Sequence, residues 1–429
     1  MLSYLRAMSI TTPKLTAGQI RGFWAAWGGW TLDGMDSFIY ALVLPPAMRE
    51  LLPKSGLAAT PANTGYYGSL LFALFLLGWG ISFLWGPIAD RFGRVRILML
   101  TILCYSFFTL LGGVAANIWQ LGIFRLLAGI GIGGEWTLGG TLVAEQWPES
   151  KRVQGGAYMH SGYYVGTLLA GLLNYVVGAR YGWRAMFLVG GSPALLVAFI
   201  RWGVAEPERW QKSKKLTARQ SLGRLFSPSL RRRTFSNGLF VLISMIGLWA
   251  GSVYVPSAVT QLAARAGRAS EAAHLASNAT VLLSVGTILG CLLTPWLMER
   301  LGRRGTLGVF FALMAIFITL GFGYSFYLSQ NALPWFMSCL FFLGIGGASF
   351  CVYTIWLPEQ YPTECRASAF AFATAFGRFL AAGITFLVGA GVAYFGTVGK
   401  PVALTAIAFV LGLLLLPLGL ETKGQPLPE

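Results

Sequence analysis

Long apolar stretches recur along the whole chain, and they constrain its fold more than any other feature. Each is long enough to cross about 30 Å of hydrocarbon as a helix. Charged residues make up only 11% of the 429 residues, which argues against a soluble enzyme. The stretches are continuous rather than alternating, so they predict helices rather than a β-barrel. We predict twelve membrane-spanning helices, near residues 20–44, 65–88, 97–114, 119–144, 154–178, 183–204, 234–260, 273–298, 306–329, 334–358, 367–394 and 401–420.

The placement of the basic residues predicts the orientation of the chain, because cytoplasmic loops are enriched in Lys and Arg. With the N-terminus inside, 22 of the 32 Lys and Arg lie on the cytoplasmic side, 7 on the other side and 3 within spans. The net charge of +17 is therefore a topology signal and not a sign of nucleic-acid binding. We expect a multi-pass inner-membrane protein with both termini in the cytoplasm and no cleavable signal peptide in its first twenty residues.

The longest polar segment, 205–233, divides the predicted spans six and six and is rich in Lys and Arg. We interpret it as a cytoplasmic linker next to the membrane surface. The predicted organisation is an N-terminal six-helix bundle at 1–204, the basic linker at 205–233 and a C-terminal six-helix bundle at 234–429.

Two pairs of motifs indicate an internal repeat. EQWPESKR at 145–152 matches EQYPTECR at 359–366, and DRFGR at 90–94 matches ERLGR at 299–303. The offsets are nearly equal, and the motifs of each pair follow equivalent spans of the two halves. Parallel repeats of this kind are typical of secondary transporters, whose substrate site lies between the repeats near the membrane midplane.

Several motifs carry a resemblance to a known family. GPIADRFGRVR at 86–96 and RLLAGIGIGGE at 125–135 resemble two motifs of the major facilitator superfamily. Within it, AAWGGWTLDGMDSFIYALVL at 25–44 and GGEWTLGGTLVAEQWPESKR at 133–152 are similar to the sialate:proton symporters, which include sialic-acid transporters and lactate permeases. The Asp-Gly-x-Asp element, and GRF around Arg378, resemble the aromatic-acid:proton symporters.

The resemblance implies an all-α integral membrane protein of two pseudo-symmetric six-helix bundles that imports a small organic anion together with a proton by alternating access. Sialic-acid transporters of this type carry extra spans where this chain has its linker, so a smaller monocarboxylate such as lactate or pyruvate is the expected substrate. The alternatives are an aromatic acid, a sugar acid or a proton-independent sugar-type permease. Drug efflux and a sensor role are weaker rivals.

Other classes of partner are not expected. The five cysteines have no metal-like spacing, so we expect no metal site. The chain has no phosphate-binding GxxxxGK[ST] loop and no cluster of catalytic groups, so we expect no cofactor and no enzymatic activity. The expected partners are the organic anion, the proton and the lipid bilayer, with the chain acting as a monomer.

Four charged residues within the predicted spans are candidates for proton coupling, because a charge in the bilayer is costly unless it is used. Asp33 and Asp36 share one helix face, and a desolvated carboxylate can take up a proton near neutral pH. Arg125 lies at a similar depth to Asp36, so we predict that the two form a pair. Glu135 lies closer to the cytoplasm and is either a second proton site or a tether.

Arg378 lies about 17 Å into its span, and its planar guanidinium suits a substrate carboxylate. A structural pairing with Asp33 is the alternative. Further substrate-binding candidates on neighbouring spans are His160, Tyr353, Trp356, Trp249 and Tyr254.

The repeated loop motifs are candidates for gating, because their charges can pair when the cytoplasmic ends of the two halves meet. Such pairs would open and close with the alternating-access cycle. The candidate gating residues are Asp90, Arg91, Gly93, Arg94, Glu145, Arg152, Glu299, Arg303, Glu359 and Arg366.

Overall fold

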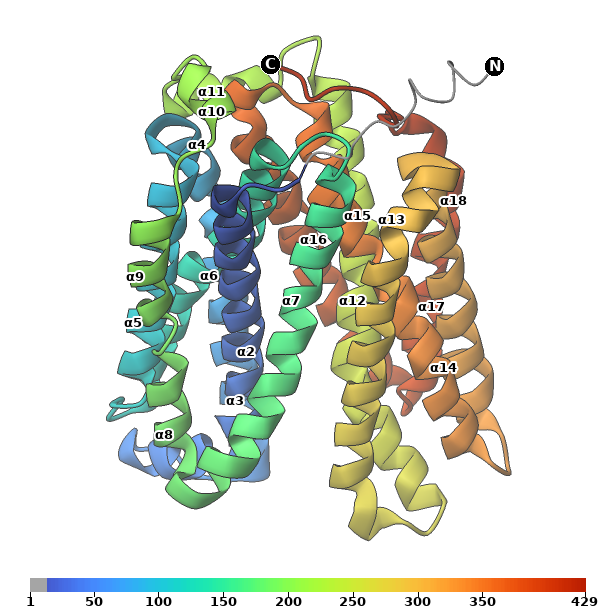
Figure 1. Cartoon of the computed structure of the whole chain (residues 1–429). Coiled ribbons are helices and arrows are strands. Elements are labelled where there is room, and N and C mark those ends of the chain that lie inside the picture. Colours follow the sequence, from blue (N-terminus) through green and yellow to red (C-terminus); the bar gives the residue numbers. More distant parts are fainter. Residues whose placement is uncertain (1–13) are drawn as a thin grey trace.

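Figure 1 shows the computed structural model, a bundle of long helices that run roughly parallel to one another. No β-strand occurs among residues 14–429, which the structure describes, so the predicted all-α class is confirmed. Residues 1–13, and with them much of the segment expected to lack a signal peptide, lie outside the described residues. Also outside are the side chains at 41, 45, 61, 62, 65, 69, 198, 201, 202, 248–253, 382, 385, 386, 389 and 393.

The first half of the bundle begins at a clear sequence signal. The Thr16 hydroxyl accepts a hydrogen bond from the Gln19 backbone N–H, and the Gln19 side-chain oxygen accepts one from the Thr16 backbone N–H, which caps the first helix. The helices of this half are α2 (Ala17–Lys54), α3 (Pro61–Ile81), α4 (Trp85–Phe92), α5 (Arg94–Gly112), α6 (Ile118–Gln146), α7 (Arg152–Leu173), α8 (Ala179–Gly190) and α9 (Ala194–Gly203).

Two short helices occupy the predicted linker, and the second half follows them. The linker helices are α10 (Glu208–Lys212) and α11 (Ala218–Leu225). The helices of the second half are α12 (Arg231–Arg265), α13 (Ala272–Ile318), α14 (Ala332–Gly347), α15 (Ser349–Trp356), α16 (Arg366–Phe395), α17 (Gly399–Leu404) and α18 (Ala406–Leu415).

All twelve predicted spans lie on helical segments. Among the residues that the structure describes, seven stretches are long and apolar enough to cross a membrane by length and composition, and they cover or overlap nine of the predicted spans. The remaining three spans lie on α2, α12 and α16. The predicted spans therefore fall on helices, although span 183–204 is broken between α8 and α9 and span 334–358 between α14 and α15.

Two glycines turn the chain at equivalent places in the two halves. Gly93, with φ 118°, separates α4 from α5, and Gly302, with φ 73°, breaks α13 between its two predicted spans. Residues with a side chain rarely adopt these dihedrals. The repeated motifs DRFGR and ERLGR thus mark the same backbone turn, which reverses one span into the next.

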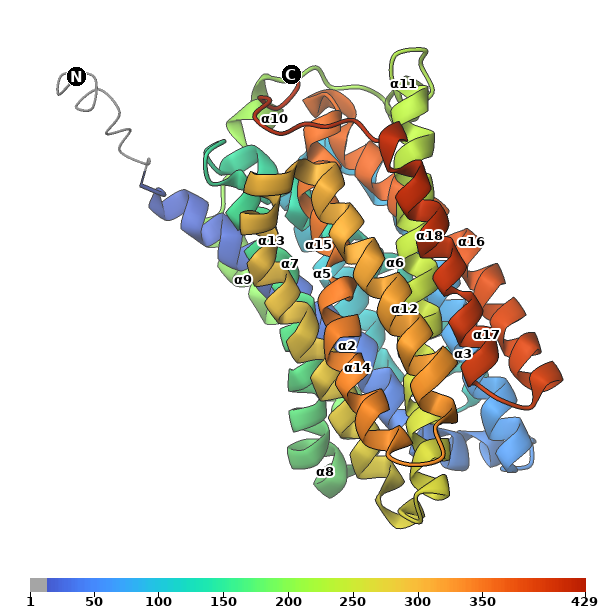
Figure 2. The same cartoon turned by 90° about the vertical axis from the view of Figure 1, so that its right-hand side faces the viewer.

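The two halves meet along a few helices. Helix α7 packs against α13 and α15, and α16 packs against α3, α4 and α6. Both the first turn of α2 and the C-terminal segment lie at one end of the bundle, here called the terminal face (Figure 1). Figure 2 shows the linker helices α10 and α11 at this same face, above the tilted helices of the second half.

Candidate functional site

Four charged side chains lie inside the first half at membrane depth. Asp33 and Asp36 on α2 and Glu135 on α6 are fully buried, and Arg125 on α6 is 1% exposed. Burial without partners costs an ionised group several kcal/mol, on the order of 2.5–3.5 kcal/mol even on lenient scales. Each of these groups therefore needs either a partner, a proton or a functional reason to be there.

Asp36 and Arg125 lie together, as their depth along the two helices predicts. The distance from Arg125 Nη1 to Asp36 Oδ2 is 3.7 Å. The guanidinium is sandwiched between the rings of Tyr40 and Phe75, with ring centroids at 4.5 and 4.3 Å. These cation–π contacts hold the arginine in place. Both members of the pair belong to the first half.

Arg378 on α16 of the second half reaches over the first half. Its guanidinium stacks on Trp79 of α3 at 4.3 Å and lies 5.6 Å from the ring of Trp136 of α6. It forms no ion pair within 4 Å with any described residue. Arg378 is therefore a buried cation whose hydrogen-bonding edge is not used by a neighbouring acid.

The aromatic residues around Arg378 form one cluster. Trp30 on α2 stacks on Trp136, with centroids 5.8 Å apart, and contacts Tyr163 of α7 at 4.8 Å. His160 lies 5.5 Å from Trp136 and 5.9 Å from Trp30. We call Trp30, Asp33, Trp79, Trp136, His160 and Arg378 the central site.

Five buried polar atoms of the central site have no hydrogen-bond partner among the described residues. A buried donor or acceptor without a partner costs about 1–3 kcal/mol. These atoms therefore offer hydrogen-bonding capacity to a ligand. They are Trp30 Nε1, Asp33 Oδ2, Trp79 Nε1, His160 Nε2 and Arg378 Nε.

His160 also bridges the two halves. Its Nδ1 lies 2.9 Å from the Thr354 hydroxyl on α15, which also accepts a hydrogen bond of 2.7 Å from Trp136 Nε1. Sequence reasoning missed Thr354, Trp30, Trp79 and Trp136. The usable signals were the position of Trp30 three residues before Asp33 on one helix face, and Trp136 directly after Glu135.

Glu135 lies apart from both arginines. Its Oε1 accepts a hydrogen bond of 3.0 Å from Thr101 of α5, and its Oε2 packs against Gly29 of α2. Glu135 therefore connects α6 with α5 and α2, which agrees with the structural tether, one of the two roles predicted for it from the sequence. Whether it also titrates stays a prediction.

The polar atoms of two other predicted substrate residues, Tyr353 and Trp356, bind within the second half rather than in the central site. The Tyr353 hydroxyl lies 2.9 Å from that of Ser244 and donates to the carbonyl oxygen of Phe240 at 2.7 Å. Trp356 Nε1 donates to the carbonyl oxygen of Leu420 at 2.7 Å. These polar atoms are already satisfied within the second half. Tyr254 is partly buried on α12, and the Trp249 side chain lies outside the described residues.

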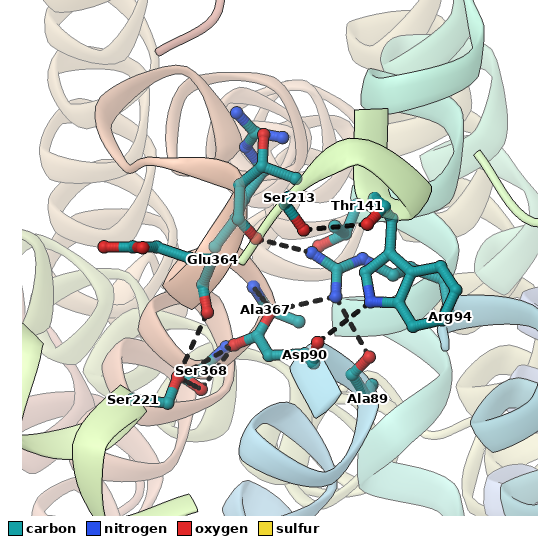
Figure 3. Close-up of polar contacts among 12 residues, drawn as sticks. Ala89, Asp90, Arg94, Thr141, Ser213, Ser221, Glu364, Ala367 and Ser368 are labelled. Carbon is teal, nitrogen blue, oxygen red and sulfur yellow. Dashed lines mark hydrogen bonds and ion pairs between the residues drawn. The ribbon is translucent and has the colours of Figure 1, made fainter. Parts of the chain in front are cut away.

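A buried polar cluster joins the halves at the terminal face. The Asp90 carboxylate accepts hydrogen bonds from the backbone N–H groups of Ala367 (3.2 Å) and Ser368 (2.9 Å), at the N-terminus of α16 (Figure 3). It also pairs with Arg94 at 2.9 Å. A carboxylate at a helix N-terminus satisfies free N–H groups and the helix dipole. First-half Asp90 thus caps a second-half helix.

Glu145 extends this cluster, because it binds one arginine from each half. It lies 3.0 Å from Arg94 and 2.7 Å from Arg366, and all three side chains are fully buried. We call Asp90, Arg94, Glu145, Arg366 and Ser368 the Asp90 cluster. In addition, Arg94 Nη2 donates to the carbonyl oxygen of Thr363 across the interface at 2.8 Å.

A second cluster repeats the arrangement. Glu359 binds Arg303 of its own half at 2.7 Å and Arg152 of the first half at 3.0 Å. The Thr422 hydroxyl donates to Glu359 at 2.5 Å. We call Arg152, Arg303, Glu359 and Thr422 the Glu359 cluster. The glutamate of each repeated motif, Glu145 or Glu359, therefore forms one ion pair within its own half and one with the other half.

Two glutamates that the sequence analysis did not single out complete the repeat. Glu206 accepts hydrogen bonds from the backbone N–H groups of Arg94, Val95 and Arg96, directly after the turn at Gly93. Glu421 does the same for Arg303 and Arg304 after Gly302. The sequence signal for Glu206 and Glu421 is that each follows the sixth predicted span of its half.

Not every predicted gating residue enters these clusters. Arg91 and Glu299 are exposed, and no ion pair with either is present among the described residues. Gly93 acts through its backbone turn. The linker does contribute: Ser221 of α11 lies 3.2 Å from Asp90 and 2.7 Å from Ser368, and Trp210 Nε1 donates to the Asp90 carbonyl oxygen at 2.9 Å (Figure 3).

The described ion pairs between the halves all lie at the terminal face. Deeper in the bundle, the described side-chain hydrogen bonds between the halves are those of Thr354 to Trp136 and His160 and that of Cys351 Sγ to the carbonyl oxygen of Ala157. The structure is therefore held shut at the terminal face. No group of three or more His, Cys, Asp or Glu side chains in the described part of the chain could hold a metal ion.

Known proteins share this architecture. Residues 26–381 match the sequence profile of the Major Facilitator Superfamily. A protein of Cupriavidus pinatubonensis named "Probable 4-methylmuconolactone transporter" is 31% identical over 421 residues, which covers 95% of this chain and 91% of that protein. The niacin transporter NiaP of Acinetobacter baylyi is 29% identical over 434 residues, which covers 94% of each chain.

A solved structure has the same fold. The proton:xylose symporter XylE bound to 6-bromo-6-deoxy-D-glucose aligns with a TM-score of 0.78 at 20% identity, over 96% of this chain and 98% of that one. At this identity the likeness shows the fold alone, and it confirms the predicted arrangement of two six-helix bundles. The chain therefore belongs to the Major Facilitator Superfamily and is a multi-pass membrane transporter of a small organic substrate, not an enzyme.

Proposed function

We propose that this transporter imports a small organic anion together with a proton by alternating access. The observation that carries the proposal is Arg378, a permanent cation that is only 6% exposed and has no acid in contact among the described residues. A carboxylate on the substrate would complete its planar hydrogen-bonding edge. Asp33 and Asp36 supply the carboxylates that a proton-coupled carrier needs.

The surroundings of Arg378 favour one class of anion. The indoles of Trp30, Trp79 and Trp136 supply flat apolar faces beside the guanidinium, and such faces stack on planar ligands. Niacin, named for one relative, is an aromatic acid. We therefore favour an aromatic acid, which is one of the alternatives that the sequence leaves open. Lactate or pyruvate, which the sequence resemblance favours, stays a prediction that no described contact addresses.

The two polar clusters support transport by alternating access. With the terminal face in the cytoplasm, as the basic residues predict, the Asp90 and Glu359 clusters hold the cytoplasmic side shut. The substrate would then enter from the outside and leave after these clusters separate. In this scheme the protein lies in the inner membrane and works as a monomer, with its domain boundaries at the ends of the basic linker.

Uptake into proteoliposomes tests the proposal. Vesicles loaded with a pH-sensitive dye would receive nicotinate, 4-hydroxybenzoate, lactate or glucose under an inward proton gradient. We expect protein-dependent acidification with a carboxylate. Arg378→Lys should weaken uptake at least about tenfold, because Lys keeps the charge but loses the planar fork and its stacking. Arg378→Ala should lose uptake entirely.

Protein-free vesicles correct for passive entry of undissociated acid. Uptake of glucose without any dependence on pH would contradict the proposal and favour a sugar-type permease. Undiminished acid uptake by Arg378→Ala would remove the substrate role of this arginine.

A further inference from the structure

His160 on α7 has two ring nitrogens that differ in how they are used. Its Nδ1 lies 2.9 Å from the hydroxyl oxygen of Thr354. Its Nε2 has no hydrogen-bond partner among the described residues, although the side chain is only 2% exposed. Burial of a polar atom without a partner costs stability. Nε2 is therefore a position at which a bound ligand can supply the missing partner.

The Thr354 hydroxyl decides which nitrogen of His160 carries the proton. It accepts a hydrogen bond of 2.7 Å from Trp136 Nε1, which can only donate. The Phe350 carbonyl oxygen lies 3.4 Å from the hydroxyl, beyond the usual length of an O–H···O bond, whereas His160 Nδ1 lies at 2.9 Å. These distances place the Thr354 proton in the bond to Nδ1. A neutral imidazole with an accepting Nδ1 carries its own proton on Nε2, so Nε2–H is a donor.

His160 borders the same indole as Arg378. The imidazole centroid lies 5.5 Å from the ring of Trp136 and 5.9 Å from that of Trp30, and the Arg378 guanidinium lies 5.6 Å from the ring of Trp136. Aromatic faces of this kind stack on planar ligands. The cation and the imidazole donor therefore lie on either contact of one flat surface, where an aromatic acid can meet both.

We propose that His160 is a further substrate-binding residue, which donates a hydrogen bond from Nε2–H to an acceptor on the ring of the transported acid, and that Thr354 is its positioning residue. This inference rests on the proposed function and deepens it, because it names a second feature of the substrate. The substrate carries a ring nitrogen or oxygen acceptor in addition to the carboxylate that Arg378 binds. An acid whose ring lacks such an acceptor leaves the buried donor unpartnered and binds more weakly.

The positioning residue belongs to the other half of the molecule. Thr354 lies on α15 of the second half, whereas Trp136 and His160 lie on α6 and α7 of the first half. Its hydrogen bonds to both depend on the packing of α15 against α6 and α7. When the halves part at this level, Nδ1 loses the hydroxyl and the imidazole is free to adopt either tautomer. The selectivity for a ring acceptor therefore belongs to the state in which the halves are closed around the site.

The test compares acids that offer Arg378 the same carboxylate. Benzoate has no ring acceptor, whereas nicotinate and isonicotinate each carry a ring nitrogen, at different distances from the carboxylate. Their Kd values would be measured on the purified full-length carrier by competition against radiolabelled benzoate. The preference is the Kd of benzoate divided by the Kd of the pyridine acid that binds better. His160→Leu should lower this preference at least about fivefold, the value of one neutral hydrogen bond.

Matched variants separate the donor from general damage to the site. Thr354→Val keeps the shape of the side chain but removes the hydroxyl, and it should lower the preference at least about threefold. Thr354→Ser keeps the hydroxyl and should stay within about twofold of the wild type. Arg378→Lys should weaken all three acids and change the preference by no more than about twofold, because every acid loses the same contact. If His160→Leu is not monodisperse, His160→Phe replaces it.

A preference that does not fall in His160→Leu would overturn the donor role of His160 and leave the proposed function in place. So would a fall of the same size in Arg378→Lys, because the loss would then not be specific to the ring acceptor. Equal losses in Thr354→Val and Thr354→Ser would remove the positioning role of the hydroxyl. If the wild type transports other organic acids but binds no aromatic acid, this inference fails alone. If it transports no organic acid, the proposed function fails first.

Discussion

Single buried charges in this protein are explained by what surrounds them. Asp36 forms an ion pair with Arg125, and Glu135 accepts a hydrogen bond from Thr101. Arg378 contacts two indole rings and no acid among the described residues. The chain supplies the residue types, but the choice of partner depends on which helices become neighbours. This is why depth along the helices predicts the Asp36–Arg125 pair, whereas the indole contacts of Arg378 cannot be derived from depth.

Glu50 illustrates a residue-scale effect outside the membrane. It lies beyond the predicted span 20–44, and hydrogen bonds from Lys54, Arg184 and Trp183 lower its pKa to about 2. A lowered folded-state pKa means that the stabilisation is present above the ordinary value of 4.5 and is lost as the pH falls toward 2. Since the Glu50 side chain is 37% exposed, we expect at most about 1 kcal/mol.

Thermal unfolding in detergent checks this expectation for Glu50→Gln against the wild type. The difference in unfolding temperature should be constant above about pH 5 and should shrink as the pH approaches about 3. A difference that grows on acidification would contradict the assignment of the effect to ionised Glu50.

At the scale of elements, glycine decides how closely the helices of the first half approach. A Cβ on Gly131 of α6 would lie 2.5 Å from the backbone nitrogen of Tyr105 on α5, and a Cβ on Gly129 would collide with the Phe75 carbonyl oxygen on α3. Small residues permit such close packing of membrane helices. The glycine-rich stretch 129–134 is therefore a packing surface.

This packing leads to a prediction with an internal control. Gly131→Ala should destabilise the protein by about 1–3 kcal/mol, because backbone atoms cannot move aside. Gly171→Ala should be neutral or slightly stabilising, since nothing lies within 4 Å of the added Cβ and Ala favours the helix. Thermal unfolding measures both. Equal unfolding temperatures for the two variants would refute the close approach of α5 and α6.

The whole molecule is closed at the terminal face by links that cross between the halves. Arg152 and Arg366 supply these links to Glu359 and Glu145. The C-terminal segment adds to them: the carbonyl oxygen of Gln425 accepts from Arg152 at 3.3 Å, and that of Pro428 accepts from Arg366 at 2.6 Å. The end of the described chain thus binds arginines from both halves and stabilises the closed face.

Arg152→Gln should open the terminal face without leaving a bare charge, because Glu359 keeps Arg303 and Thr422. Losing a charge-assisted bond of about 1.5–3 kcal/mol should raise the open population about tenfold or more. Spin labels at Arg96 and Arg300, both exposed at this face, should show a longer distance component. Arg209→Gln, which loses only an exposed pair with Glu149, should leave the distances unchanged.

The sequence by itself determined the helical spans and the repeat of the gating motifs. These depend on local composition, since hydropathy over about twenty residues decides what enters a membrane. The tertiary structure alone decided that Arg378 stacks on Trp79, that Asp90 caps α16 and that Glu145 binds arginines from both halves. Such partners lie hundreds of residues apart, so only the lateral packing of the helices brings them together.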